Sequence, residues 1–182
     1  MTVSFRVPPD WRVYACTDEP MNSIFSAGSP VSHFSLDFNV DENSRKLSLA
    51  EQYRSYLDFI RAHADDKVQM RREAKFRLPD GRQLTPYRYF SEYWGQRLVL
   101  LIPEGDYTCQ FEFSARSSLA ALRGSHTAIQ QVLQSYRCVH KSHLTRRCSE
   151  PRPAPMRSFR VAILLSSQPR ALSGAVADLV SR

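Results

Sequence analysis

The feature that most constrains the fold is a succession of short segments in which apolar and polar residues alternate. Residues 34–40 and 107–113 show the pattern most clearly, with an apolar residue at every second position. Alternate side chains of a β-strand point to opposite faces, so each segment predicts a half-buried strand. The turns between neighbouring segments, such as Pro79-Asp80-Gly81, have hairpin length, which predicts antiparallel pairing.

Further strands are predicted on both sides of these segments. Two short strands, 3–7 and 11–15, are predicted around a proline-rich turn. Residues 68–78 and 83–93 predict one strand each, and the second of these is rich in aromatic residues. Residues 98–102 form a continuous apolar run, which predicts a central strand that is covered on both faces.

Two helices complete the pattern. Ser48 and Glu51 form a capping-box sequence, which predicts a helix over residues 49–64 with one apolar face. A second amphipathic helix is predicted from Ser125 to Tyr136. Hairpin-linked strands with two covering helices predict the α+β class: an antiparallel β-sheet meander flanked by two helices, an αβα sandwich, with an irregular C-terminal tail.

The charge distribution predicts a boundary near Arg137. Residues 1–137 carry 17 basic and 16 acidic side chains, whereas residues 138–182 carry 8 basic and 2 acidic ones. All but one of the aromatic residues lie in the first part, and prolines alternate just past the join. We therefore predict one domain, residues 1–137, followed by a basic, Pro/Arg-rich tail, residues 138–182, that is disordered.

Several of these segments together resemble the PsbP/DcrB-like superfamily over residues 3–137. The resemblance lies in the order of the elements and in loose patterns, namely Phe5-Arg-Val-Pro-Pro-Asp-Trp11, Phe34-Ser-Leu-Asp-Phe38, Leu101-Ile-Pro-Glu-Gly-Asp-Tyr107, Phe111-Glu-Phe-Ser-Ala115 and Gln131-Val-Leu-Gln-Ser-Tyr136. It implies an αβα sandwich and a role that is not enzymatic, with no catalytic motif to transfer.

Members of this superfamily include photosystem II accessory subunits, a Ran-binding factor, bacterial envelope lipoproteins and the cytosolic Eag-type chaperones of type VI secretion effectors. The N-terminus shows neither a secretory-signal pattern nor a lipobox, and no apolar run approaches the length of a membrane span. These features favour the chaperone branch and a cytoplasmic protein. The partner that the resemblance implies is a hydrophobic helix of a secreted effector, and no cofactor is expected.

An aromatic group on the predicted strand 83–93 is the candidate partner-binding surface. Alternation places its members on both faces of the sheet, so those that no helix covers would offer an amphipathic surface to a peptide or helix. Packing in the core is the alternative interpretation. The candidate residues are Tyr87, Tyr89, Tyr93 and Trp94.

Two other functions remain open. The first is an enzyme whose site is assembled from scattered residues, although the sequence contains no phosphate loop or nucleophile motif. The second acts through the tail, either by zinc binding or by phosphate contacts to nucleic acid, but the ligand spacing matches no known zinc motif and the arginines lack interleaved aromatic residues. The candidate zinc ligands are Cys138, His140, His143 and Cys148, and the basic residues are Arg146, Arg147, Arg152, Arg157 and Arg160.

Overall fold

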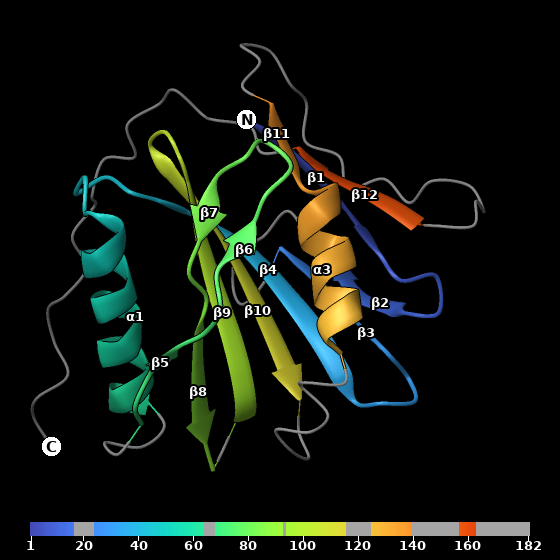
Figure 1. Cartoon of the computed structure of the whole chain (residues 1–182), viewed down its shortest axis with the longest axis horizontal. Coiled ribbons are helices and arrows are strands. Elements are labelled where there is room, and N and C mark those ends of the chain that lie inside the picture. Colours follow the sequence, from blue (N-terminus) through green and yellow to red (C-terminus); the bar gives the residue numbers. More distant parts are fainter. Residues whose placement is uncertain (17–23, 64–67, 93, 116–124, 140–156, 163–182) are drawn as a thin grey trace, which may run out of the picture.

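The computed structural model describes residues 1–16, 24–63, 68–92, 94–115, 125–139 and 157–162 (Figure 1). Its elements in chain order are β1 (Thr2–Val7), β2 (Arg12–Cys16), β3 (Phe25–Gly28), β4 (Phe34–Glu42), α1 (Leu49–His63), β5 (Arg71–Arg72), β6 (Phe76–Arg77), β7 (Gln83–Leu84), β8 (Tyr87–Ser91), β9 (Gly95–Glu104), β10 (Tyr107–Ala115), α3 (His126–Ser135), β11 (Arg137–Val139) and β12 (Arg157–Ala162). Neither helix in the described ranges is long and apolar enough to cross a membrane.

A large antiparallel sheet forms the centre of the molecule. Its strand order is β2-β3-β4-β10-β9-β8-β5, and β8, β9 and β10 follow one another as a meander. Strand β4 pairs with β10 over its whole length, so β10 lies between β4 and β9. The predicted antiparallel sheet and the α+β class are therefore confirmed.

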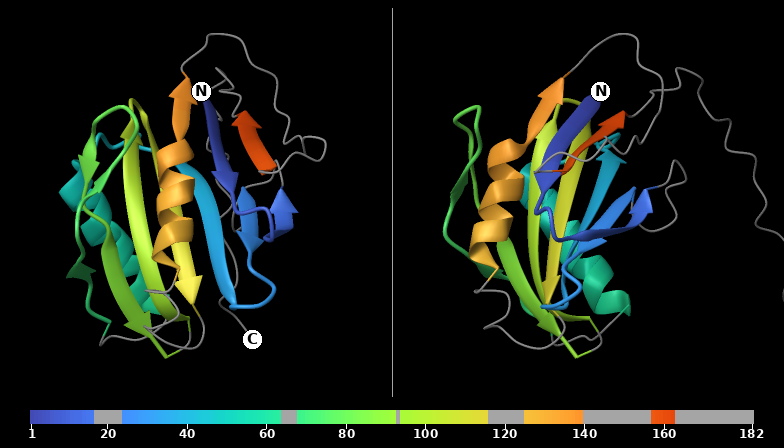
Figure 2. Two further views of the ribbon diagram at one scale, coloured as in Figure 1. Left: turned by 45° about the vertical axis from the view of Figure 1, so that its right-hand side comes forward. Right: turned by 90° about the vertical axis from the view of Figure 1, so that its right-hand side faces the viewer.

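The two helices lie on opposite faces of this sheet (Figure 2). Strand β9 contributes to both apolar layers: Leu98, Leu100 and Ile102 join the larger core under α3 and β1. Val99 and Leu101 join the smaller core under α1. All five side chains are buried, which confirms the predicted central strand.

Helix α1 begins where its capping box predicts. The Ser48 amide donates to the Glu51 carboxylate at 2.8 Å, and the Glu51 amide donates to the Ser48 hydroxyl at 3.4 Å. The side-chain and backbone hydrogen bonds from Ser48 lower the pKa of Glu51. Tyr53 and Ile60 are the buried residues of this helix.

Two predicted strands are each divided in the structure. Residues 68–78 contain β5, which joins the edge of the large sheet, and β6, which pairs only with β7. Residues 83–93 contain β7 and β8, separated by Thr85 and by Pro86, which has no amide hydrogen to donate to a ladder. The prediction of two continuous strands was wrong, because the chain leaves the edge of the large sheet after β5, forms the β6–β7 hairpin, and rejoins the sheet at β8.

This excursion brings apolar residues of the β6–β7 hairpin into the larger core. Leu78 and Leu84 pack there, whereas Val68 and Tyr89 pack under α1 on the other side of the sheet. The turn between β6 and β7 contains Gly81 with a φ of +90°, a conformation that side chains with a Cβ rarely adopt. The turn was predicted correctly, and only its place outside the large sheet was not.

Strand β1 belongs to a second, three-stranded sheet with the order β11-β1-β12. Although β1 and β2 were predicted around one turn, they do not pair, and β2 pairs with β3, a strand that the sequence pattern did not predict. Val3, Phe5 and Val7 of β1 are at most 1% exposed, so the backbone of β1 needs hydrogen-bond partners at both edges.

Strands β11 and β12 supply those partners from beyond the predicted boundary. Residues 137–139 pair with residues 2–4, and residues 157–162 pair with residues 2–7. The sheet structure therefore continues past Arg137, and the described part of the tail is strand. The rest of the predicted tail, residues 140–156 and 163–182, lies outside the described residues.

The Tyr53 hydroxyl bridges the place where the β8–β9 ladder ends. It accepts a hydrogen bond from the Leu101 amide at 2.9 Å and donates one to the Thr85 carbonyl at 3.2 Å. We expect Tyr53→Phe to lower the free energy of unfolding by about 1–3 kcal/mol, because the buried amide loses its partner. Urea denaturation measures this change. Tyr14→Phe, at a site that is 59% exposed, should alter stability by less than about 0.5 kcal/mol, and an equal loss in both variants would contradict the bridging role.

Candidate functional site

The face of the large sheet that carries α1 changes character from strand to strand. On β8 and β9 it presents Tyr87, Tyr89, Val99 and Leu101, which α1 covers. The cross-strand register continues the same face onto β10, β4 and β3, where the residues are polar. They include Ser26, Ser35, Asp37, Glu112 and Ser114. Helix α1 thus covers the apolar half of this face, and the polar half forms a separate surface.

A concavity of about 1020 Å³ lies over this polar half. Its floor comes from the strands, and its rim comes from the β3–β4 connection, β2 and the β8–β9 hairpin. Phe90 and Tyr14 on the rim are 52% and 59% exposed. The floor residues are Ser26, Ser35, Asp37, Arg97 and Ser114, and the rim includes Tyr14, His33, Phe90, Glu92 and Trp94. We refer to this site as the polar concavity.

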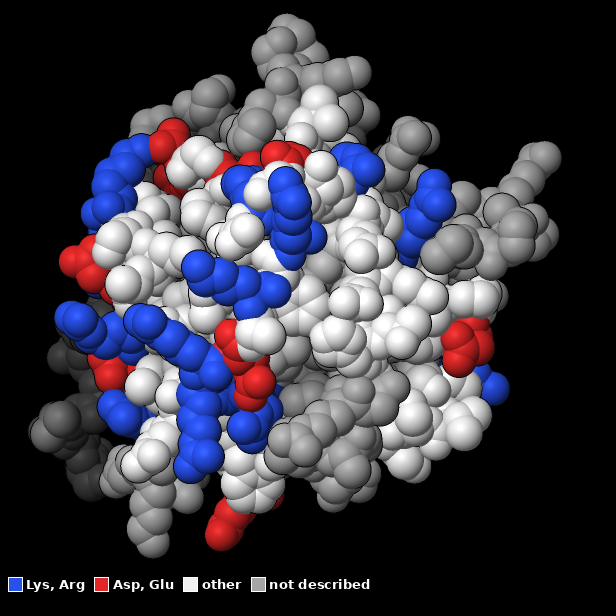
Figure 3. Space-filling model, in the orientation of Figure 1, with Lys and Arg blue, Asp and Glu red and all other residues white. Residues whose placement is uncertain are grey.

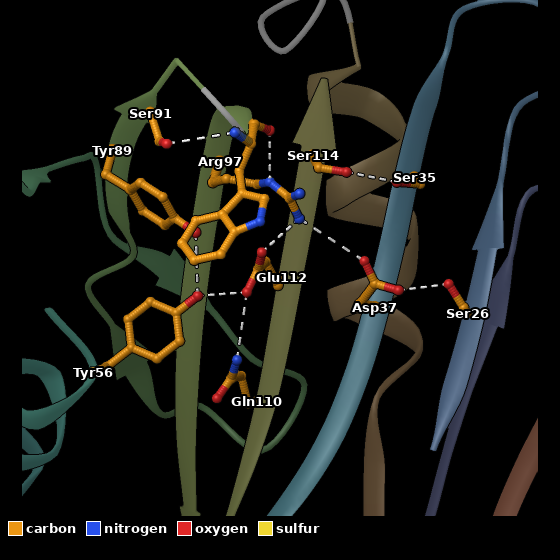
Figure 4. Close-up of polar contacts among 11 residues, drawn as sticks. Ser26, Ser35, Asp37, Tyr56, Tyr89, Ser91, Arg97, Gln110, Glu112 and Ser114 are labelled. Atoms are coloured by element: carbon orange, nitrogen blue, oxygen red, sulfur yellow. Dashed lines mark hydrogen bonds and ion pairs between the residues drawn. The ribbon is translucent and has the colours of Figure 1, made fainter. Parts of the chain in front are cut away.

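Two carboxylates stand directly opposite each other in the floor. Asp37 and Glu112 are register partners on β4 and β10, an arrangement in which like charges repel. Arg97 on β9 balances one of them, because its Nη1 lies 2.6 Å from Glu112 Oε1 but 4.0 Å from Asp37 Oδ2 (Figure 4). The Ser26 hydroxyl holds Asp37 from the other side, donating to Oδ1 at 2.5 Å.

A tyrosine of α1 also holds the Glu112 side chain in place. The Tyr56 hydroxyl donates to its second carboxylate oxygen and lies 3.4 Å from the Tyr89 hydroxyl (Figure 4). Burial, followed by the charge of Glu112, raises the pKa of Tyr56, which keeps the phenol protonated as a donor. Arg97 and Glu112 are therefore committed to the structure of the sheet.

Small residues form another part of the floor. The Ser35 and Ser114 hydroxyls lie 2.5 Å apart, and next to Ser35 the chain has Gly28. A Cβ at Gly28 would lie 2.7 Å from the Phe34 carbonyl oxygen, so any larger residue would displace the strand. Ser35 and Ser114 therefore give this part of the floor small side chains.

The predicted aromatic site is only partly at this surface. Tyr89 is 2% exposed, and Tyr87 is half-buried with its ring 4.2 Å from that of Tyr53. Both therefore pack under α1, as the alternative interpretation held. Trp94 lines the polar concavity, and Tyr93 lies outside the described residues.

The predicted metal and nucleic-acid residues fall mostly outside the described ranges. Of the four candidate zinc ligands only Cys138 is described, and no three potential metal ligands gather among the described residues. Burial, followed by the Glu104 charge, raises the pKa of the Cys138 thiol to about 11, so it is protonated at neutral pH. Arg157 and Arg160 lie in β12, and His140, His143, Arg146, Arg147, Cys148 and Arg152 are not described.

Basic side chains gather instead on another surface of the folded part. Figure 3 shows Lys and Arg side chains over the segment from β5 to β7. Four of them are exposed, and Arg72 lies against the Tyr87 ring, 5.8 Å from its centroid. The four are Arg71, Arg72, Lys75 and Arg77. The folded part therefore has an uneven charge distribution that its nearly neutral total hides.

No protein-family model matches the sequence, and no curated protein matches it. Among solved structures, the chain is similar to cyanobacterial PsbP (CyanoP) from Synechocystis, with a TM-score of 0.52 and 12% sequence identity over 75% of this chain and 86% of that chain. The chain has a PsbP-like fold. This result confirms the fold that the resemblance implied, but it does not support the DcrB or Eag-type branches in particular.

At such low identity the PsbP-like fold transfers no residue roles, so the site must be judged by its own geometry. Apart from Trp94, the described residues that line the polar concavity were not predicted as a site. Alternation marked Asp37 and Glu112 as facing away from the apolar core, and Ser35 and Ser114 likewise. A signal was available: polar residues of β4 and β10 share one face, which is too rich in small and charged residues to be covered by an apolar helix face.

Proposed function

We propose that this chain is a non-enzymatic protein-binding module that receives a segment of a partner protein in the polar concavity. The observation that carries the proposal is that the apolar contacts of α1 end on β8 and β9, while the polar half of the same face is hollowed. Exposed aromatic rings at the rim and hydroxyl groups in the floor suit a segment with both apolar and polar side chains.

The hydrogen bonds of the floor favour binding over catalysis. Ser26 donates to Asp37, and Ser35 pairs with Ser114. Within the described ranges, none of these hydroxyls is hydrogen-bonded to an imidazole that could act as a general base. An enzyme with scattered catalytic residues is therefore the weaker alternative.

In its most specific form, the proposal is a cytosolic chaperone or adaptor for the hydrophobic segments of a secreted effector. A helix with an apolar stripe would place that stripe against Phe90, Trp94 and Tyr14 and its polar side against the floor. The small floor residues would allow the helix backbone to approach the sheet closely.

We expect Phe90→Ser to reduce recovery of a stoichiometric partner at least tenfold. The measurement is affinity purification of the tagged full-length chain from its native cells after cross-linking, followed by mass spectrometry. Phe59→Ser is the matched control, because Phe59 on α1 is 54% exposed, as Phe90 is 52% exposed, but does not line the polar concavity. Equal recovery with both variants, cross-links that map elsewhere or the absence of a stoichiometric partner would contradict the proposal.

A further inference from the structure

We infer, building on the proposed function, that the polar concavity recognises a cationic group on its partner, a Lys or Arg side chain bound at Asp37. The charge balance of the concavity supports this inference. Two carboxylates line the concavity, those of Asp37 and Glu92, and the carboxylate of Glu112 lies opposite Asp37, where Arg97 balances it. Among the described lining residues, Arg97 is the one Lys or Arg. The site thus carries a net negative charge that a cationic group would balance.

The distances assign the unbalanced negative charge to the Asp37 carboxylate. Arg97 donates from Nη1 to Glu112 at 2.6 Å and from Nε to the Trp94 carbonyl at 3.0 Å, so two of its donors are used. Its 4.0 Å separation from Asp37 Oδ2 exceeds hydrogen-bonding distance. Among the described residues no donor reaches Oδ2, whereas Oδ1 is held by Ser26.

Asp37 is more exposed than the other two charged residues beside it. Its side chain is 31% exposed, compared with 15% for Glu112 and 18% for Arg97. Its position opposite Glu112 costs stability, because like charges in directly opposed strand positions repel. A cation beside Oδ2 would remove this repulsion and would add a charge-assisted hydrogen bond.

The rim suits the remainder of a basic side chain. Trp94, Phe90 and Tyr14 line the same concavity, and aromatic rings attract a guanidinium or ammonium group through their faces while the alkyl stem packs on their carbon atoms. An anionic group would meet Asp37 and Glu92. A bare metal ion is disfavoured, because no three potential ligands gather among the described residues.

The test uses three synthetic amphipathic helical peptides of identical Leu/Ser composition with Arg, norleucine or Glu at the central position. Binding to the full-length chain is followed by the two indole N–H signals in NMR. Trp94 lines the concavity, and Trp11 is 3% exposed in the other layer, so Trp94 should shift and Trp11 should not. We expect the Arg peptide to bind at least about tenfold more tightly than the norleucine peptide.

Asp37→Asn should abolish that tenfold difference, because the amide carries no charge to attract the guanidinium. Asp58→Asn is the matched control, since Asp58 is an exposed carboxylate on α1, and this variant should keep the difference. Equal binding of all three peptides, or an unaltered preference in Asp37→Asn, would overturn the cationic specificity while leaving segment binding intact.

A titration with methylguanidinium distinguishes failure of the cation site from failure of the proposed segment docking. If no peptide shifts the Trp94 signal but methylguanidinium shifts it in the native chain and not in Asp37→Asn, the cation site stands and the proposed docking of a segment fails. If neither methylguanidinium nor any peptide shifts Trp94, both inferences are overturned.

Discussion

Replacing Phe111 by alanine is expected to lower the free energy of unfolding by about 3–5 kcal/mol. Phe111 on β10 is completely buried and joins three parts of the fold. Its ring centroid lies 5.2 Å from that of Phe5 on β1, 4.8 Å from Phe38 on β4 and 5.6 Å from Tyr136 after α3. The cavity left by the truncation would remove contacts from both sheets and from the helix layer.

Urea denaturation of the native chain and of Phe111→Ala, monitored by circular dichroism, measures this loss. Phe90→Ala is the matched control, because Phe90 is 52% exposed and its truncation should change stability by less than about 0.5 kcal/mol. A loss below about 1 kcal/mol for Phe111→Ala would show that β1 and α3 do not pack on the large sheet as described.

Arg82→Met is expected to destabilise the protein by about 3 kcal/mol and to lower its Tm by about 6–12 °C. Arg82 follows the β6–β7 turn and donates to Glu104 Oε1 at 2.6 Å and to the Pro103 carbonyl at 2.8 Å. The Glu104 side chain is 9% exposed and also accepts from the Tyr136 hydroxyl at 2.8 Å. Without the guanidinium, the buried carboxylate loses its counter-charge, which is more costly than losing a surface ion pair.

A double-mutant cycle distinguishes this cause from simple loss of packing. Arg82→Met combined with Glu104→Met removes both charges, so the double variant should recover at least half of the stability lost in Arg82→Met. The readout is the Tm from thermal unfolding at neutral pH. If the effects of the two single substitutions add, then Arg82 and Glu104 do not act as a pair, and the hairpin is held by other contacts.

Local patterns predicted several elements correctly because their causes are local. Ser48 and Glu51 lie three residues apart, so the capping box at the start of α1 forms within one turn. The apolar run at 98–102 required cover on both faces, and the two apolar layers supply it. The alternation in 34–40 and 107–113 fixed which side chains of β4 and β10 enter the core.

Predictions failed where the partner of a segment lies far away in the chain. Residues 157–162 follow a proline-rich, basic segment and were assigned to the tail, but β1 provides an edge that they pair with. The segment 68–78 has a period of two on average, and yet its halves enter different apolar layers. Composition alone led to a boundary at Arg137, because charge and aromatic content do not report backbone hydrogen bonds.

The candidate site divides in the same way. The sequence by itself determined that Ser35, Asp37 and Glu112 lie on the face away from Phe38 and Phe111, because side chains alternate strictly along a strand. Only the tertiary structure decided that Asp37 and Glu112 lie opposite each other and that Arg97 forms an ion pair with Glu112. It also decided that α1 covers the apolar residues of β8 and β9 beside them. Alternation specifies the face of each residue, whereas strand register and helix docking depend on contacts between residues distant in the sequence.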